Sequence, residues 1–157
     1  LYAVEPEDAL ELLCSVVESS APDLVIGTSM GGMLATYVDC PTAVKVAINP
    51  ALDMERTLRK IGYGRHPYLQ PRENGETEFV IDEVMIHRFI DFRSEHEMKS
   101  GVRNIALFST DDELISKRHA ATLGNLGWEI FWSSRFGHRC NDQAVKEIVK
   151  ALKGENG

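Results

Sequence analysis

The stretch that decides the fold occupies residues 24–32 and reads Leu24-Val25-Ile26-Gly27-Thr28-Ser29-Met30-Gly31-Gly32. A short apolar run ends there in Gly-x-Ser-x-Gly, and the apolar residues 33–38 that follow predict a helix. Strand, turn and helix in this order are the setting of a nucleophile elbow, which lifts a serine hydroxyl clear of a sheet. We predict that Gly27 and Gly31 flank Ser29 because the strand and helix backbones approach too closely there for a Cβ. The alternative is a glycine- and serine-rich loop in another kind of α/β protein; the flanking strand and helix favour the elbow.

Outward from this stretch, predicted strands alternate with predicted helices. Further strands are expected at 44–49, 103–109 and 128–132, and helices at about 6–21, 33–39, 53–61, 116–126 and from Asn141 onward. Asp53 and Asn141 are the expected caps of two of these helices. The alternation predicts an α/β fold in three layers, with a mostly parallel sheet and helices on both faces. Residues 1–4 are compatible with the end of an edge strand, and four residues do not decide this.

The stretch from Pro50 to Gly101 is longer than one crossover helix requires. Glycines, prolines and an asparagine break it, and we predict a short strand at 79–81 and a helix at 83–92 within it. We expect residues 1–157 to form one domain in which an insertion at about 52–100 lines a pocket. The alternative for this insertion is surface packing with no ligand contact.

The composition excludes several classes of function. The chain has 157 residues, 43% of them hydrophobic and 26% charged, which is ordinary for one globular domain with a sizeable core. A net charge of −7 argues against a nucleic-acid or anionic-membrane surface, and the apolar runs are shorter than a bilayer span. The three cysteines, Cys14, Cys40 and Cys140, are scattered and odd in number, so we expect a reducing compartment, the cytoplasm.

Three residue types with complementary chemistry follow predicted strands. Ser29 follows one strand, Asp111 and Asp112 follow the strand at 103–109, and His138 follows the strand at 128–132. Because the carboxyl ends of parallel strands meet at one rim of a sheet, these side chains are expected to gather there. A serine needs a base to take its proton, and the base needs a third group to hold its tautomer. The alternative for the two aspartates is capping of the helix that follows.

The other reactive side chains are assigned to packing or to the surface. Four histidines follow no core strand and form no metal-ligand spacing with a cysteine or carboxylate, namely His66, His87, His96 and His119. We expect Cys140 to be a packing residue, since it lacks an elbow. A basic cluster is expected to be a solvated helix face, with recognition of an anionic substrate group as its alternative: Arg56, Arg59, Lys60 and Arg65.

On these motifs the chain resembles the YqiA/YcfP-type small esterases of the α/β-hydrolase superfamily. The resemblance covers nearly the whole chain in order, although 58–98 matches only loosely. It rests on four segments: Gly27-Thr28-Ser29-Met30-Gly31-Gly32, Ile48-Asn49-Pro50-Ala51, Thr110-Asp111-Asp112-Glu113-Leu114 and Phe136-Gly137-His138. Of these, the Asn-Pro-Ala segment is more specific to the family than the serine motif, which many hydrolases share.

The resemblance implies roles for the residues that match. Ser29 would be the nucleophile, His138 the base and Asp112 the acid, because the family's Gly-Asp-Glu aligns with residues 111–113. The N–H of Met30 would help to hold the oxyanion. The implied activity is hydrolysis of esters or thioesters with short acyl chains through an acyl-enzyme, with no cofactor and no metal.

One departure concerns the family's opening strand. That strand carries a His-Gly motif whose loop supplies the second oxyanion N–H, and no such segment precedes Leu1-Tyr2 in the sequence given. We therefore expect a fold that lacks its N-terminal strand or strands in this chain. Two other functions remain open: an inactive binding protein that keeps the fold, and a patatin-like acyl hydrolase that uses a Ser–Asp dyad and has no need of His138. The sequence predicts no nucleic-acid or membrane partner and leaves the oligomeric state open.

Overall fold

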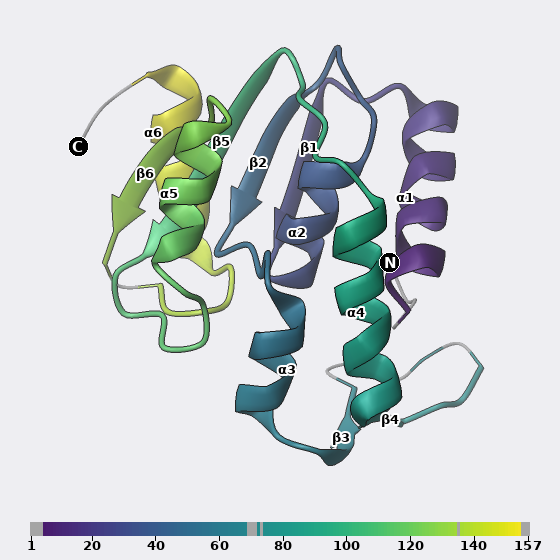
Figure 1. The fold of residues 1–157 in the computed structure, drawn as a ribbon. Coiled ribbons are helices and arrows are strands. Elements are labelled where there is room, and N and C mark those ends of the chain that lie inside the picture. The colour runs from purple at the N-terminus through teal and green to yellow at the C-terminus, as the bar shows by residue number, and fades with distance from the viewer. Residues whose placement is uncertain (1–4, 69–71, 73, 135, 155–157) are drawn as a thin grey trace.

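The computed structural model describes residues 5–68, 72, 74–134 and 136–154, and Figure 1 shows their arrangement. The core is a four-stranded sheet in the order β1-β2-β5-β6, in which every neighbouring pair is parallel. Its strands are β1 (Leu24–Thr28), β2 (Val44–Ile48), β5 (Arg103–Ser109) and β6 (Glu129–Ser133). The predicted parallel sheet is confirmed. The strand end suggested for residues 1–4 lies outside the described residues.

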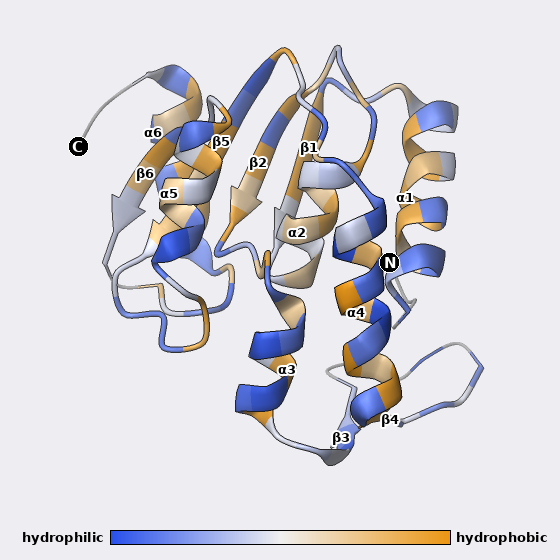
Figure 2. Ribbon diagram, viewed as in Figure 1, coloured by the Kyte–Doolittle hydropathy of each residue, from blue (hydrophilic) through white to orange (hydrophobic). Residues whose placement is uncertain are grey.

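Helices cover both faces of this sheet, as predicted. They are α1 (Pro6–Ser20), α2 (Met30–Tyr37), α3 (Met54–Ile61), α4 (Glu83–Glu95), α5 (Arg118–Asn125) and α6 (Asp142–Lys153). Since side chains alternate between the faces of a strand, Ala47 and Ala106 pack into one core with α2, α4 and α5. Their neighbours Val46 and Ile105 pack on the opposite face against α6. In Figure 2, α2 carries no strongly hydrophilic residue, whereas α3 shows hydrophilic turns.

The long middle stretch contains the two elements predicted for it and one that was missed. The strand appears as β4 (Glu78–Ile81) and the helix as α4, which Asp82 caps by accepting from the backbone N–H of Met85 at 2.8 Å. A further strand, β3 (Gly64–Pro67), pairs antiparallel with β4. Its sequence, Gly-Arg-His-Pro, has no β-branched or aliphatic residue, so the pattern gave no strand signal.

Strand β1 lies at an edge of the described sheet. Among the described residues its one strand neighbour is β2, and its side chains Leu24 and Ile26 are 39% and 49% exposed. The helix α6, which covers the same face farther along, packs on β2 and β5. Within the described part of the chain, no helix is both long enough and apolar enough to cross a bilayer.

Candidate active site

The loops that follow β1, β5 and β6 all leave the sheet at its carboxyl rim (Figure 1). Ser29 comes directly after β1, Asp112 three residues after β5, and His138 five residues after β6. The parallel direction of the strands brings these three loops together, although the residues lie far apart in the chain.

Ser29 adopts a backbone conformation that L-residues rarely use. Its φ of 54° and ψ of −118° form a sharp turn between β1 and α2. Hydrogen bonds hold that turn on both sides: the N–H of Ser29 donates to the carbonyl of Ile48 at 2.9 Å, and the carbonyl of Ser29 accepts from the N–H of Ala51 at 3.1 Å. The strained geometry of an elbow is therefore present at the predicted serine.

The close approach of strand and helix involves Gly27 and Gly32. A Cβ on Gly27 would lie 2.0 Å from the carbonyl oxygen of Gly31, and a Cβ on Gly32 would lie 3.1 Å from the Cα of Pro50. A Cβ on Gly31 would meet nothing within 4 Å. The reason given above for a glycine at Gly31 is thus wrong. The first turn of α2 presses its next residue, Gly32, against the end of β2, while Gly31 faces open space.

The structure brings Ser29, His138 and Asp112 into one hydrogen-bonded chain. The Nε2 atom of His138 lies 2.9 Å from the Oγ of Ser29, and its Nδ1 atom lies 2.8 Å from the Oδ2 of Asp112. The side chain of Asp112 is 3% exposed and that of His138 is 23% exposed. The carboxylate is thus buried behind the imidazole, and the imidazole separates it from a partly exposed hydroxyl.

The two neighbouring aspartates have different partners. Asp112 directs Oδ2 to His138 and accepts with Oδ1 from the N–H groups of Leu114 at 2.8 Å and Ile115 at 3.2 Å. Asp111 turns the other way and accepts from the hydroxyl of Ser109 and, at 3.3 Å, from the N–H of Gly137. Neither acid caps the helix that follows, because α5 begins at Arg118 and its N-cap, Lys117, makes no side-chain cap hydrogen bond. One oxygen of Asp112 instead holds the turn before that helix, and its other oxygen faces the imidazole.

Met30 begins α2, so its N–H belongs to the first turn, where amides have no acceptor within the helix. The partial positive charge of this helix end adjoins Ser29, where it favours a nearby negative charge. Among the described residues, no group of three or more His, Cys, Asp and Glu side chains is arranged to hold a metal ion.

Each of the remaining histidines contacts a backbone carbonyl, and none of these carbonyls belongs to Ser29, Asp112 or His138. Their acceptors are the carbonyl oxygens of four different residues: Gly62 for His66, Glu83 for His87, Phe92 for His96 and Pro50 for His119. His119 is a packing residue, 5% exposed, and its Nε2 atom lies 2.7 Å from the carboxylate of Asp53. The predicted cap is not made: Asp53 stands at the N-cap of α3, but its carboxylate faces His119 and Arg56 and makes no side-chain cap hydrogen bond.

Two further expectations concern reactive and charged residues. Cys140 is exposed, so its assignment to packing is wrong; it lies in the turn between the His138 loop and α6. Each member of the basic cluster contacts a protein group. The contacts are Arg56 with Asp53, Arg59 with Glu83, Arg65 with Glu78, and Lys60 with the carbonyl oxygen of Leu114. Three of the four residues lie on α3 as predicted, whereas Arg65 lies on β3. The contacts favour a solvated surface over recognition of an anion.

Asn49 belongs to the Ile48-Asn49-Pro50-Ala51 segment, and the sequence predicts no role for its side chain. In the structure it is fully buried at the end of β2, and its amide nitrogen donates to the carbonyl of Gly137 at 2.8 Å. Its amide oxygen accepts from the N–H of Ser109 at 2.8 Å. An Asn-Pro pair after a strand indicates only a turn, so no sequence signal reported these contacts.

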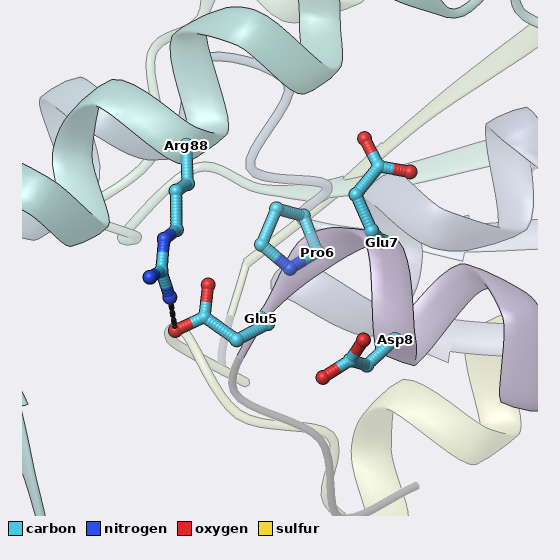
Figure 3. Close-up of a pocket in the computed structure, with 5 residues that line it drawn as sticks. All are labelled: Glu5, Pro6, Glu7, Asp8 and Arg88. Atoms are coloured by element: carbon cyan, nitrogen blue, oxygen red, sulfur yellow. Dashed lines mark ion pairs between the residues drawn. The ribbon is translucent and has the colours of Figure 1, made fainter.

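A surface hollow lies elsewhere on the molecule. It is lined by Glu5, Pro6, Glu7, Asp8 and Arg88, where the first turn of α1 faces α4, and Glu5 pairs with Arg88 across it (Figure 3). None of the predicted site residues lines it. The hollow is therefore separate from the rim where Ser29 and His138 meet.

Comparison with known proteins gives a family for the chain. No curated protein matches it. Among solved structures, it is similar to SOBER1 of Arabidopsis thaliana and to a point variant of that protein, each with a TM-score of 0.49 and 12% sequence identity. The match covers 96% of this chain and 64% of SOBER1, so the chain spans about two thirds of that protein's length. Residues 3–151 match the model of an uncharacterised protein family, UPF0227, which is the YqiA/YcfP-type family that the motifs resemble. The chain therefore belongs to the UPF0227 family.

Proposed function

We propose that this protein is a serine hydrolase that cleaves carboxylic esters or thioesters with short acyl chains. In this proposal Ser29 is the nucleophile, His138 the general base and acid, and Asp112 the group that orients His138. The N–H of Met30 contributes to the oxyanion hole. The reaction requires no cofactor, and the site is proposed to work in the cytoplasm, with residues 52–100 supplying part of the pocket wall.

The observation that carries the proposal is the position of one imidazole between a hydroxyl and a carboxylate. The distances of 2.9 Å to Ser29 Oγ and 2.8 Å to Asp112 Oδ2 allow the proton of the hydroxyl to pass to Nε2 while Nδ1–H donates to the carboxylate. This assignment fixes the tautomer that a base requires. The hydrolase-type fold and the family are consistent with it.

The proposed reaction proceeds in two halves. Ser29 Oγ attacks the acyl carbonyl carbon as His138 takes its proton, and the carbonyl oxygen becomes an oxyanion next to the N–H of Met30. Collapse of this intermediate breaks the bond to the alcohol or thiol, which receives the proton from His138 and leaves an acyl-Ser29 ester. Water then loses a proton to His138, attacks that ester and releases the carboxylic acid, and His138 returns the proton to Ser29.

A fluorophosphonate probe tests the proposal directly, because it reacts covalently with an activated serine. We expect the protein to be labelled and Ser29→Ala to lose the label. Ser109→Ala is unsuitable as the control because Ser109 lies close to the site, so Ser94→Ala, on the exposed side of α4, is the matched serine variant. Absence of labelling in the wild-type protein, with its fold verified by circular dichroism, would favour an inactive binding protein instead.

The Ser–Asp dyad is the weaker alternative. A dyad requires the carboxylate to reach the serine hydroxyl itself, whereas the partner of Ser29 Oγ here is Nε2 of His138. No observation on the described residues favours the dyad, and the His138→Ala variant discussed below separates the two mechanisms.

A further inference from the structure

Four residues outside the Ser29–His138–Asp112 chain form a closed ring of hydrogen bonds at the same rim. The amide nitrogen of Asn49 donates to the carbonyl of Gly137 at 2.8 Å, and the N–H of Gly137 donates to Asp111 Oδ1 at 3.3 Å. Asp111 also accepts from the hydroxyl of Ser109, and the N–H of Ser109 donates to the amide oxygen of Asn49 at 2.8 Å. The ring thus joins the ends of β2 and β5 to the residue that precedes His138.

The half of the ring next to the sheet is buried, whereas Asp111 is exposed. Asn49 is 0% exposed and Ser109 is 3% exposed, so the hydrogen bond between them faces little competition from water. The amide nitrogen of Asn49 also donates to the carbonyl of His138 at 3.2 Å, which is a direct contact with the proposed base. Both peptide groups on either side of His138 Cα are therefore held, directly or through Gly137.

Two residues of the ring have an unusual backbone conformation. Asn49 has a φ of 41° and Gly137 a φ of 60°, both in the left-handed region. Asparagine tolerates this region better than most residues, and glycine occupies it without penalty. These two residues pass the chain sharply out of β2 and into the His138 loop. The hydrogen bonds of Asn49 offset the strain at that residue.

The same short segment also holds the nucleophile. Two residues after Asn49, the N–H of Ala51 donates to the carbonyl of Ser29 at 3.1 Å, and Pro50 between them packs near Gly32. Residues 49–51 therefore contact the backbone of Ser29 on one side and the backbone of His138 on the other. The separation of hydroxyl and imidazole depends on this one segment.

From this geometry we infer that Asn49, Ser109 and Asp111 are positioning residues: they fix the His138 loop so that its imidazole stays within hydrogen-bond distance of Ser29. The inference rests on the proposed function for its catalytic consequence. A displacement of about 1 Å between reacting groups costs on the order of 100-fold in rate, so loosening the ring is expected to slow acylation without removing a reacting group.

The principal test is Asn49→Asp. This variant keeps the volume and the oxygen that accepts from Ser109, but it replaces the donor to the carbonyls of Gly137 and His138 with a second acceptor. The matched control is Asn104→Asp, because Asn104 binds the backbone of Gly101 in a similar way at the opposite end of β5. We expect fluorophosphonate labelling to slow about 30- to 100-fold in Asn49→Asp and less than about twofold in Asn104→Asp. Both rates are measured well below each variant's melting temperature.

A second readout does not depend on catalysis. Amide hydrogen exchange of Gly137, whose N–H donates to Asp111, is measured by NMR and is expected to accelerate at least tenfold in Asn49→Asp relative to Asn104→Asp. If the wild-type protein is not labelled at all, the proposed function fails. The exchange measurement alone then decides whether the hydrogen-bond ring holds the His138 loop. Unchanged exchange at Gly137 would overturn the inference. Where the wild-type protein is labelled, an equal labelling rate in Asn49→Asp would overturn it as well.

Ser109→Ala serves if Asn49→Asp does not fold. This variant removes only the hydroxyl that donates to Asp111. The N–H of residue 109 still donates to the amide oxygen of Asn49. We expect labelling to slow about tenfold, with faster exchange at Gly137. A Ser109→Ala protein that matches the wild type in both readouts contradicts the inference.

Discussion

The two rims of the four-stranded sheet carry polar networks of different kinds. At the carboxyl rim, the hydrogen bonds of Asn49 and Asp111 aim the loop of His138, and Ser29, Asn49 and Gly137 all have positive φ. At the amino rim, the fully buried Lys45 donates to the carbonyls of Val38 and Lys99, and neither it nor these partners has a positive φ.

The two networks have different roles: the one at the carboxyl rim positions side chains, and the one at the amino rim stabilises the fold. The amino-rim network satisfies a buried charge with carbonyls that an ordinary backbone supplies, and it joins the end of α2 to the segment before β5. The carboxyl-rim network maintains a strained backbone, a feature that concentrates where side chains must be aimed at a reaction. We therefore expect changes at the carboxyl rim to reduce activity first, and changes at the amino rim to reduce stability alone.

The largest effect is expected at the carboxyl rim from His138→Ala. Loss of the base should lower kcat/KM for p-nitrophenyl butyrate by about 10⁴- to 10⁶-fold, because the Ser29 hydroxyl would keep its proton. The melting temperature should change by only a few degrees, since the imidazole is 23% exposed. The control is His87→Ala, on the exposed face of α4. Full activity in His138→Ala would establish the Ser–Asp dyad instead.

Asp112→Asn should have the next largest effect. An amide at this position stabilises the wrong tautomer of His138, so kcat should fall about 10³- to 10⁴-fold with KM nearly unchanged. Asp111→Asn retains an oxygen for the N–H of Gly137 and should cost about tenfold or less. Asp91→Asn, on the surface of α4, is the inert control. A larger loss in Asp111→Asn than in Asp112→Asn would reverse the roles assigned to the two acids.

Two glycine variants test which position in the elbow has room for a Cβ. Gly27→Ala places a Cβ 2.0 Å from a backbone oxygen and should lower the free energy of unfolding by about 3 kcal/mol or more. Gly31→Ala adds a methyl group in open space within a helix and should be neutral or stabilising by up to about 1 kcal/mol. Urea denaturation of both variants measures the difference. Equal destabilisation would show that the helix approaches the strand differently.

The smallest effect is expected at the amino rim, from Lys45→Met. This variant leaves the carbonyls of Val38 and Lys99 without their donor and should cost about 2 kcal/mol in unfolding free energy, with labelling of Ser29 unchanged. The matched charged control is Lys146→Met on the exposed side of α6. A labelling rate that falls in Lys45→Met at temperatures where the protein is folded would contradict the division between the rims.

Lys45 also makes the free energy of unfolding depend on pH. Burial lowers the pKa of Lys45 from 10.5 to about 8, against smaller opposite effects of Cys40, Asp39 and Cys14. Between these two values the unfolded chain binds more protons than the folded protein, so the contribution of Lys45 to stability rises with pH from about 8 to 10.5. Tyr37, whose pKa burial raises, acts in the opposite direction above pH 10. Urea denaturation of the wild type and Lys45→Met across pH 7–10 measures the difference, which should grow as the pH rises.

Several features could be predicted because their signals are local. The elbow at Ser29, the strand at 103–109 and the Asn141 cap of α6 follow from short patterns of apolar, glycine and capping residues. The order of Ser29, Asp112 and His138 indicated a common rim because parallel strands end together. These features need no knowledge of which distant residues touch.

Other features depend on contacts that no local pattern encodes. The burial of Lys45 near the start of the otherwise apolar strand β2 depends on the carbonyls of Val38 and Lys99, which accept its hydrogen bonds. The role of Asn49 requires that residues 60 and 88 positions away meet it at one rim. Gly31 and Gly32 are neighbours with the same propensities, and the packing of α2 on β2 alone distinguishes them. Tertiary geometry, rather than residue type, decides each of these.

The hydrogen-bond ring at Asn49 also bears on how the protein folds. Its members belong to chain segments that meet only after β2, β5 and β6 have docked, since closing such long loops precedes the contacts that reward it. During refolding from urea, helical circular dichroism should therefore recover before Ser29 becomes reactive. The delay between the two signals would time the final assembly of the sheet.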